Sequence, residues 1–311
     1  MIATVPTRAA PVPMTFRDQR CVAALFLREF RNVNGAGKLI RALCVAATIA
    51  TLACARDARA EDASAWQRDS HSAVRLLAGS RSGAVLLGGV GFQLQPGWKT
   101  YWRTPGDSGV PPRFDFSKSD NIEAVTVLWP APQRFDDGAG GVSLGYHDQI
   151  VLPLRIVAKN ADKPVTLRAS INYAVCEKIC IPVDATAELA INSVASTEDN
   201  ALFAALDTVP KPANVGDPNP LTIRDVKRSG NSEVLVDVVT PDARPVNLYV
   251  EGPTPDWALP VPKLVENGPF GVKRFSFQLE GVPPGVNPAG AALKLTLVGS
   301  DRSYEFNINL E

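Results

Sequence analysis

Residues 165–175, VTLRASINYAV, alternate apolar side chains with mostly polar ones. Side chains two positions apart on an extended strand point to the same face, so this alternation predicts a β-strand with one buried face. Leu167, Ala169, Ile171, Tyr173 and Val175 are expected to face the core. The segment therefore indicates a protein built on β-sheets.

Further alternating segments surround this one. EAVTVLW (residues 123–129) places Val125, Val127 and Trp129 on one face, and DQIVLPLRIVA (residues 148–158) repeats the pattern. The chain contains 26 Pro and 23 Gly residues, and many of them interrupt such segments and mark turns. We predict seven or eight strands between about Ser70 and Ile191, arranged as an all-β sandwich.

A second set of alternating segments begins at Leu221. It follows a short helix, for which Ser196 is the expected N-cap, and a Pro-rich linker at residues 210–220. The set contains neither Cys nor His and ends in a hairpin whose turn is residues 299–301. The predicted fold is therefore all-β, with two β-sandwich domains at residues 61–195 and 221–311. A short helix and a Pro-rich linker, residues 196–220, join them.

The first 60 residues have the pattern of a secretory signal peptide. Basic residues up to Arg41 precede a short apolar run at residues 42–54, and ARDARA offers a cleavage site after Ala60. The apolar run is too short for a membrane anchor. A lipoprotein signal ending at Cys54 is the alternative. We expect an exported protein without a membrane span in its mature chain.

Charge composition excludes one class of partner. The chain balances 32 basic against 32 acidic side chains, so its formal net charge is zero. Nucleic-acid binding and attachment to an anionic membrane surface both depend on an excess of positive charge. We therefore expect no nucleic-acid partner.

Cys176 and Cys180 are the two cysteines left once the signal is removed. If LRASINYAVC and CIPVDATAELA pair as antiparallel strands, EKI connects them and the cysteines oppose each other within reach of a disulfide. A bridge that closes a loop of about five residues stabilises a fold by roughly 2 kcal/mol, less than bridges that close long loops. Two thiols so close in sequence also suit thiol–disulfide exchange. The spacing favours a redox pair slightly over a structural staple.

Metal and acyl-transfer chemistry fit the composition less well. The mature chain has no Met, and its histidines are His71 and His147, so two thiolates would lack further soft ligands. His147 could serve a cysteine nucleophile as base, but a second cysteine four residues away would tend to oxidise that nucleophile. We predict neither a metal site nor a cofactor.

Four motifs together resemble a known family. GWKTYWRTPGDSGVPPRFDF, LWPAP, GYHDQIVLPL and YAVCEKICIPVDATAEL are similar to the N-terminal periplasmic domain of the thiol:disulfide interchange protein DsbD. The resemblance is greatest to the branch in suppressor-of-copper-sensitivity proteins of the ScsB type. It covers roughly residues 72–191.

The resemblance implies an immunoglobulin-like first sandwich with protein-disulfide reductase (oxidoreductase) activity. Electrons would come from a thioredoxin-like or DsbD/ScsB-type membrane donor and pass to oxidised periplasmic thiol proteins. Cys176 and Cys180 match the family's redox-active pair; Cys180 would form the mixed disulfide and Cys176 would resolve it. Copper tolerance, cytochrome c-type biogenesis and general disulfide correction are the pathways consistent with the resemblance.

Family members also shield the redox pair with a cap loop that carries an aromatic residue. The corresponding segment here is RFDDGAGG, so Phe135, Asp136 and Asp137 are the candidate cap residues, with Tyr101 and Tyr146 as candidate walls. Two features depart from the family: small residues stand where the aromatic is expected, and three residues rather than five separate the cysteines.

DsbD-type proteins continue into a membrane domain and a thioredoxin-like domain with a C-x-x-C motif, and this sequence shows neither. We therefore expect a stand-alone relay, in which Lys178 favours a thiolate and Glu177 opposes it. The alternative function is a non-catalytic two-sandwich binding module whose disulfide is purely structural. Its large cysteine-free second domain would then provide the docking surface.

Overall fold

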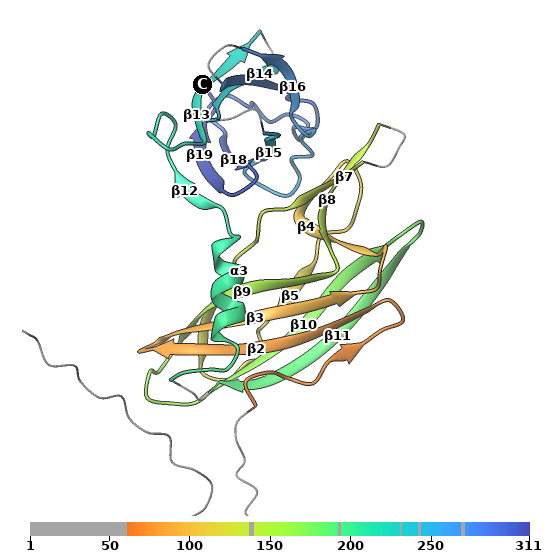
Figure 1. The fold of residues 1–311 in the computed structure, drawn as a ribbon, viewed down its shortest axis with the longest axis vertical. Coiled ribbons are helices and arrows are strands. Elements are labelled where there is room, and N and C mark those ends of the chain that lie inside the picture. Colours follow the sequence, from red (N-terminus) through yellow and green to blue (C-terminus); the bar gives the residue numbers. More distant parts are fainter. Residues whose placement is uncertain (1–60, 137–139, 192–193, 231, 242–243, 269–270) are drawn as a thin grey trace, which may run out of the picture. The chain divides into compact units, whose positions relative to one another are not determined.

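The structure is a computed structural model that describes residues 61–136, 140–191, 194–230, 232–241, 244–268 and 271–311. The predicted signal peptide, residues 1–60, lies outside the described residues, and so does Asp137. Strands account for 56% of the described residues and helix for 4%, which confirms the all-β fold class with two sandwiches. Figure 1 shows the strands of both sandwiches and the short helix that lies between them in sequence.

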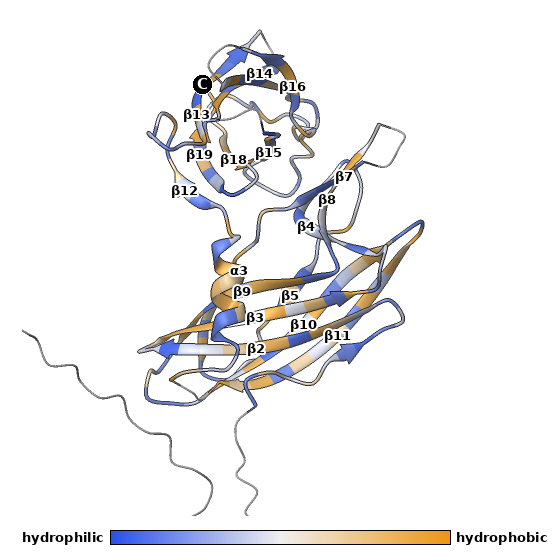
Figure 2. Cartoon of the chain, in the orientation of Figure 1, coloured by the Kyte–Doolittle hydropathy of each residue, from blue (hydrophilic) through white to orange (hydrophobic). Residues whose placement is uncertain are grey.

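Two sheets form the first sandwich. The first sheet has, in spatial order, β1 (Gln67–Arg68), β2 (Ser72–Ser82), β3 (Val85–Leu94), β9 (Gln149–Ala158) and β6 (Ile122–Val127). The second sheet has β11 (Cys180–Ile191), β10 (Val165–Cys176), β4 (Lys99–Gly106), β8 (Val142–His147) and β7 (Gln133–Asp136), with β5 (Arg113–Asp115) paired to β10. Hydrophobic residues colour much of β9 and β10 (Figure 2).

The core of this sandwich follows the predicted alternation. Leu167, Ala169, Ile171, Tyr173 and Val175 of β10 are all buried, which confirms the predicted face. The strand count was underestimated, since the described part of the region runs from β2 through β11 rather than over seven or eight strands. Strands of three or four residues, such as β5 and β7, are too short to display a period.

The helix α3 (Asp199–Asp207) begins later than predicted. Its N-cap is Glu198 and not Ser196, whose hydroxyl instead accepts a hydrogen bond from the Glu198 amide at 3.0 Å. Leu202 is fully buried because Gly79 and Gly89 leave room for it: a Cβ on either glycine would lie 2.7 or 2.6 Å from a Leu202 methyl carbon. The packing of Leu202 against Gly79 and Gly89 therefore attaches the short helix to the first sandwich.

The second sandwich has two four-stranded sheets. One contains β12 (Lys211–Ala213), β19 (Ser303–Asn309), β18 (Ala292–Val298) and β15 (Asn247–Glu251). The other contains β13 (Thr222–Ser229), β14 (Glu233–Val239), β17 (Val272–Gln278) and β16 (Lys263–Asn267). The final hairpin agrees with prediction, since Leu293, Leu295 and Leu297 are buried. The predicted linker differs, because it contributes β12, which pairs in parallel with β19.

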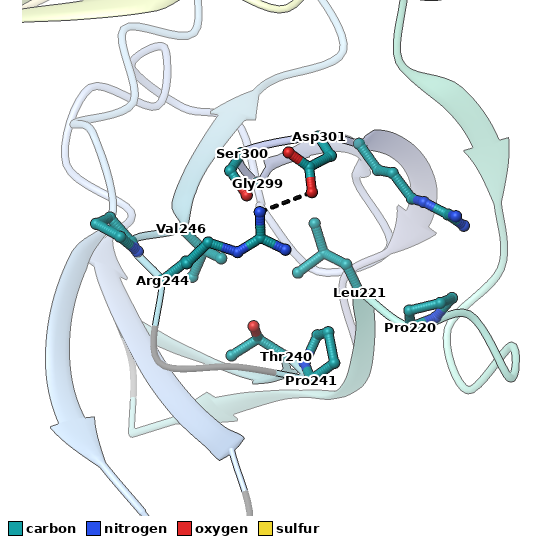
Figure 3. Close-up of a pocket in the computed structure, with 11 residues that line it drawn as sticks. Pro220, Leu221, Thr240, Pro241, Arg244, Val246, Gly299, Ser300 and Asp301 are labelled. Carbon is teal, nitrogen blue, oxygen red and sulfur yellow. Dashed lines mark hydrogen bonds and ion pairs between the residues drawn. The ribbon is translucent and has the colours of Figure 1, made fainter.

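A pocket of about 220 Å³ lies beside the turn that follows β18 (Figure 3). Its walls include Leu221, Val246 and the turn residues 299–302. Arg244 donates a hydrogen bond of 2.7 Å to Asp301, with both side chains at least half exposed. An exposed ion pair of this kind contributes little to stability.

Residues 60–311 form one compact unit, and several of its ion pairs join residues distant in sequence. Arg103 of β4 donates to both carboxylate oxygens of Glu251, at 2.8 and 2.7 Å, and also pairs with Glu305. Trp102, next to it, packs its ring 5.9 Å from that of Tyr249. A bidentate Arg–carboxylate pair with little solvent exposure fixes the relative orientation of its two side chains better than a single hydrogen bond does.

Tyr249 is buried, and its hydroxyl has no hydrogen-bond partner among the described residues. Burial raises the pKa of Tyr249 far above its ordinary value. We expect Tyr249→Phe to increase the free energy of unfolding near neutral pH by about 1 kcal/mol, because an unpaired buried hydroxyl is removed. Urea unfolding at pH 8 measures this effect.

The same variant should change the response to alkali. Above about pH 10 the tyrosine ionises in the unfolded chain but stays protonated in the fold, so each such group lowers stability by up to about 1.4 kcal/mol per pH unit. Tyr249→Phe removes one of these groups and should lose less stability between pH 9 and 11 than the wild type. Equal losses in the two proteins would contradict this prediction.

Candidate redox site

The cysteine pair lies at the end of the hairpin formed by β10 and β11. Cys176 ends β10, Cys180 begins β11, and the two residues are direct partners in the antiparallel register. Their Cα atoms are 4.2 Å apart, and a disulfide joins them. The predicted hairpin, its three-residue connection and the opposition of the cysteines are thereby confirmed.

The two cysteines differ in exposure to solvent. Cys176 is 2% exposed and packs with Tyr101 and Ala174, whereas Cys180 is exposed. Ile179, which precedes Cys180, is 67% exposed at the tip of the hairpin. Cys180 is therefore the more accessible of the two cysteines.

Tyr101 is the polar group nearest to the disulfide. Its hydroxyl donates a hydrogen bond to the Cys176 sulfur at 2.9 Å and lies 3.3 Å from the Cys180 sulfur. Burial raises the pKa of Tyr101 above its ordinary value, so the hydroxyl keeps its proton at neutral pH. The site thus contains a hydrogen-bond donor directed at the sulfur of the more buried cysteine.

A glycine covers the ring of Tyr101. Gly109 has a φ of +133°, and a Cβ at this position would lie 2.3 Å from the Cε1 atom of Tyr101. Both the backbone conformation and the close approach exclude a side chain. The backbone at Gly109 therefore packs directly against the ring of Tyr101.

A pocket of about 390 Å³ adjoins Cys176. Its lining comprises Gly97, Trp98, Lys99, Phe135, Asp136, His147, Asp148, Cys176 and Glu177. Phe135 lies across this pocket, with the Lys99 ammonium nitrogen 5.1 Å from its ring centre and the His147 ring at 6.0 Å. The aromatic residue and two basic side chains thus form one contiguous group beside the buried sulfur.

The structure brings together some of the predicted cap and wall residues and separates others. Phe135 and Asp136 line the pocket, and Asp136 pairs with Arg134 at 2.8 Å. Tyr146 instead packs in the main core of the sandwich and donates to the Pro130 carbonyl at 2.8 Å. Of the two predicted wall residues, Tyr101 alone belongs to the cluster that contains Cys176. The roles of all these residues remain predictions.

Sequence reasoning did not find Trp98, Lys99 and Gly109. Lys99 and Trp98 reach the site because β4 pairs with the end of β10, and that pairing joins residues far apart in the chain. A positive φ at Gly109 is compatible with the turn-like composition of its segment, TPGDSGVPP, but its contact with Tyr101 depends on tertiary packing.

Two further observations concern metal binding and membrane-spanning helices. Within the described ranges, no group of three or more His, Cys, Asp or Glu side chains is placed to hold a metal ion. No helix in the part of the chain that the structure describes is long and apolar enough to cross a membrane.

The sandwich and its disulfide-bearing hairpin define a domain related to thiol–disulfide interchange. Residues 74–191 match the family model described as "Thiol:disulfide interchange protein DsbD, N-terminal". This part of the chain is therefore a DsbD N-terminal-like domain, as the sequence motifs had indicated. No curated protein matches the sequence.

Among solved structures, the N-terminal periplasmic domain of ScsB from Proteus mirabilis is similar over 80% of this chain and 98% of its own, with a TM-score of 0.65 and 23% identity. At this identity the match establishes the fold. A conserved domain protein from Bacillus anthracis (TM-score 0.21, 10% identity, 75% of each chain) and a marsupial T cell receptor (TM-score 0.22, 10% identity, 79% of this chain and 99% of its own) are too dissimilar in fold to support any comparison.

Proposed function

We propose that this protein is a periplasmic thiol–disulfide interchange factor that relays electrons through the Cys176–Cys180 pair. The observation that carries the proposal is the difference in exposure between the two cysteines, since Cys180 is exposed and Cys176 is 2% exposed. Exchange proceeds through a mixed disulfide, and its rate depends on which sulfur is attacked and on the access of the partner to that sulfur.

Reduction of the protein begins with a thiolate of the donor attacking the Cys180 sulfur. A bond forms between the donor sulfur and Cys180, the Cys176–Cys180 bond breaks, and its electron pair leaves on Cys176 as a thiolate. A second donor thiolate then attacks the donor sulfur of the mixed disulfide, which releases an oxidised donor and the Cys180 thiolate. The Tyr101 hydroxyl, 2.9 Å from the Cys176 sulfur, is placed to donate to the first leaving thiolate.

Oxidation of the protein follows the same path in reverse. The Cys180 thiolate attacks the disulfide of an oxidised partner, and one partner thiolate leaves. Cys176 then attacks the Cys180 sulfur, restores the internal disulfide and releases the partner fully reduced. The proposed donor is a thioredoxin-like or DsbD/ScsB-type membrane protein, and the proposed acceptors are oxidised periplasmic thiol proteins. Copper tolerance and cytochrome c-type biogenesis are the pathways we propose for it.

The test is whether the disulfide can be reduced while the protein stays folded. The full chain is incubated with a reduced thioredoxin-like protein, free thiols are alkylated, and the labelled cysteines are identified by mass spectrometry. We expect Cys176 and Cys180 to become labelled without loss of the folded circular-dichroism spectrum. A pair that remains oxidised until denaturant unfolds the chain would favour the binding module with a structural disulfide.

A further inference from the structure

Four residues form a row across the second sheet of the first sandwich. Cys180 pairs with Cys176, Cys176 pairs with Lys99 of β4, and Lys99 pairs with His147 of β8. Directly opposed residues in antiparallel strands project from the same face of a sheet. The disulfide, a lysine and a histidine therefore lie side by side on one face, and Cys176, Lys99 and His147 line the same pocket.

The Lys99 ammonium group is only partly exposed and has neutral partners. It donates to the Ser143 hydroxyl at 2.8 Å and lies over the Phe135 ring. In the described ranges no carboxylate lies within ion-pair distance of it. The contacts of the Lys99 ammonium group are therefore a hydroxyl and an aromatic ring.

Several other charged groups around Cys176 pair with residues other than Lys99. The charged and titratable side chains that line the pocket or contact the sulfur are Lys99 and Tyr101 of β4, Asp136 of β7, His147 of β8, Asp148 and Glu177. Asp136 pairs with Arg134, and Asp148 pairs with His147. Of the basic residues that line the pocket, Lys99 is the direct sheet partner of Cys176, whereas the His147 ring contacts Asp148.

We propose that Lys99 is a positioning residue whose ammonium group stabilises the thiolate that Cys176 becomes when the disulfide opens. This inference rests on the proposed function and names the group that compensates charge in its first step. A thiolate buried among apolar atoms is unfavourable unless a cation or hydrogen-bond donors accompany it. Tyr101 supplies the donor, and Lys99 supplies the charge. Lys178, which the sequence suggested could favour a thiolate, is exposed and does not line this pocket.

The test measures the ionisation of Cys176 directly. In the full chain, Cys21, Cys44, Cys54 and Cys180 are replaced by serine, which leaves Cys176 as the sole thiol. Its titration is followed by NMR of ¹³Cβ-labelled cysteine in this background and after adding Lys99→Met. Removal of a nearby cation should raise the pKa of the Cys176 thiol by about one unit.

Two controls separate charge from structure. Lys99→Arg keeps the positive charge and should leave the Cys176 pKa within about 0.3 units of the background, and Lys178→Met, which removes a lysine two residues from Cys176, should do the same. Lys99→Gln removes the charge while retaining a donor for Ser143, so it replaces Lys99→Met if that variant does not fold.

An unchanged Cys176 pKa in Lys99→Met and Lys99→Gln would overturn the role of Lys99, as would an equal shift in Lys178→Met. The titration requires no partner protein. If the wild-type disulfide exchanges but the pKa does not move, the inference about Lys99 fails and the proposed function stands. If the disulfide never exchanges in the folded protein, the proposed function itself fails.

Discussion

Replacing Cys180 with serine is expected to reduce thiol–disulfide exchange to the background rate, whereas replacing Cys176 should trap the partner. In Cys176→Ser, the exposed Cys180 thiol can still attack an oxidised partner, but no second thiol remains to release it. A mixed disulfide should therefore accumulate. In Cys180→Ser, the remaining thiol is 2% exposed and should form little or no adduct.

Both variants should remain folded. A bridge that closes a loop of about five residues contributes roughly 2 kcal/mol, and the sandwich has a core of its own. Serine replacements at Cys21, Cys44 and Cys54 in every variant exclude adducts at other thiols. Adducts are counted by non-reducing electrophoresis and mass spectrometry after incubation with an oxidised thioredoxin-like protein. Greater accumulation in Cys180→Ser than in Cys176→Ser would show that the order of attack is the reverse of the proposed one.

Tyr101→Phe is expected to slow reduction of the disulfide by about 10- to 100-fold. The variant removes the hydroxyl that donates to the Cys176 sulfur at 2.9 Å. A hydrogen bond to a charged group contributes about 1.5–3 kcal/mol, and each 1.4 kcal/mol corresponds to a factor of ten in rate. The effect should appear in the bond-breaking step, which stopped-flow measurement with excess reduced donor isolates.

Tyr146→Phe is the matched control for this experiment. Tyr146 was also a candidate wall residue, but its hydroxyl donates to the Pro130 carbonyl within the core. Its loss should lower the free energy of unfolding by about 1 kcal/mol and leave the reduction rate within about twofold. If both variants slow reduction equally, a general loosening of the sandwich explains the effect and Tyr101 has no special part in it.

The elements that the sequence predicts well are those that depend on patterns within a few consecutive residues. Alternation over residues 165–175 identifies β10 and its buried face, because period two is a property of consecutive residues. The opposition of Cys176 and Cys180 likewise follows from a three-residue connection between two strands. The short helix was expected in the right place, and only its N-cap was wrong.

Features that depend on distant pairing were not predictable in the same way. Tyr101 and Cys176 are 75 residues apart, and Lys99 reaches the site because β4 lies next to β10. The family resemblance indicated Tyr101 as a neighbour of the redox pair but gave no indication of Lys99. Strand β12 was interpreted as linker because a three-residue strand that begins with Lys-Pro shows no alternation. Its place in the sheet is determined by its partner β19.

The unequal exposure of the two sulfurs has a kinetic consequence. If both partners react at Cys180, the proposed donor and acceptor use the same binding site and cannot be bound at the same time. Turnover would then follow a ping-pong scheme, in which raising the concentration of one partner eventually inhibits the other by competition. Steady-state kinetics with both partners varied would test this scheme, because a ping-pong reaction gives parallel lines in a double-reciprocal plot.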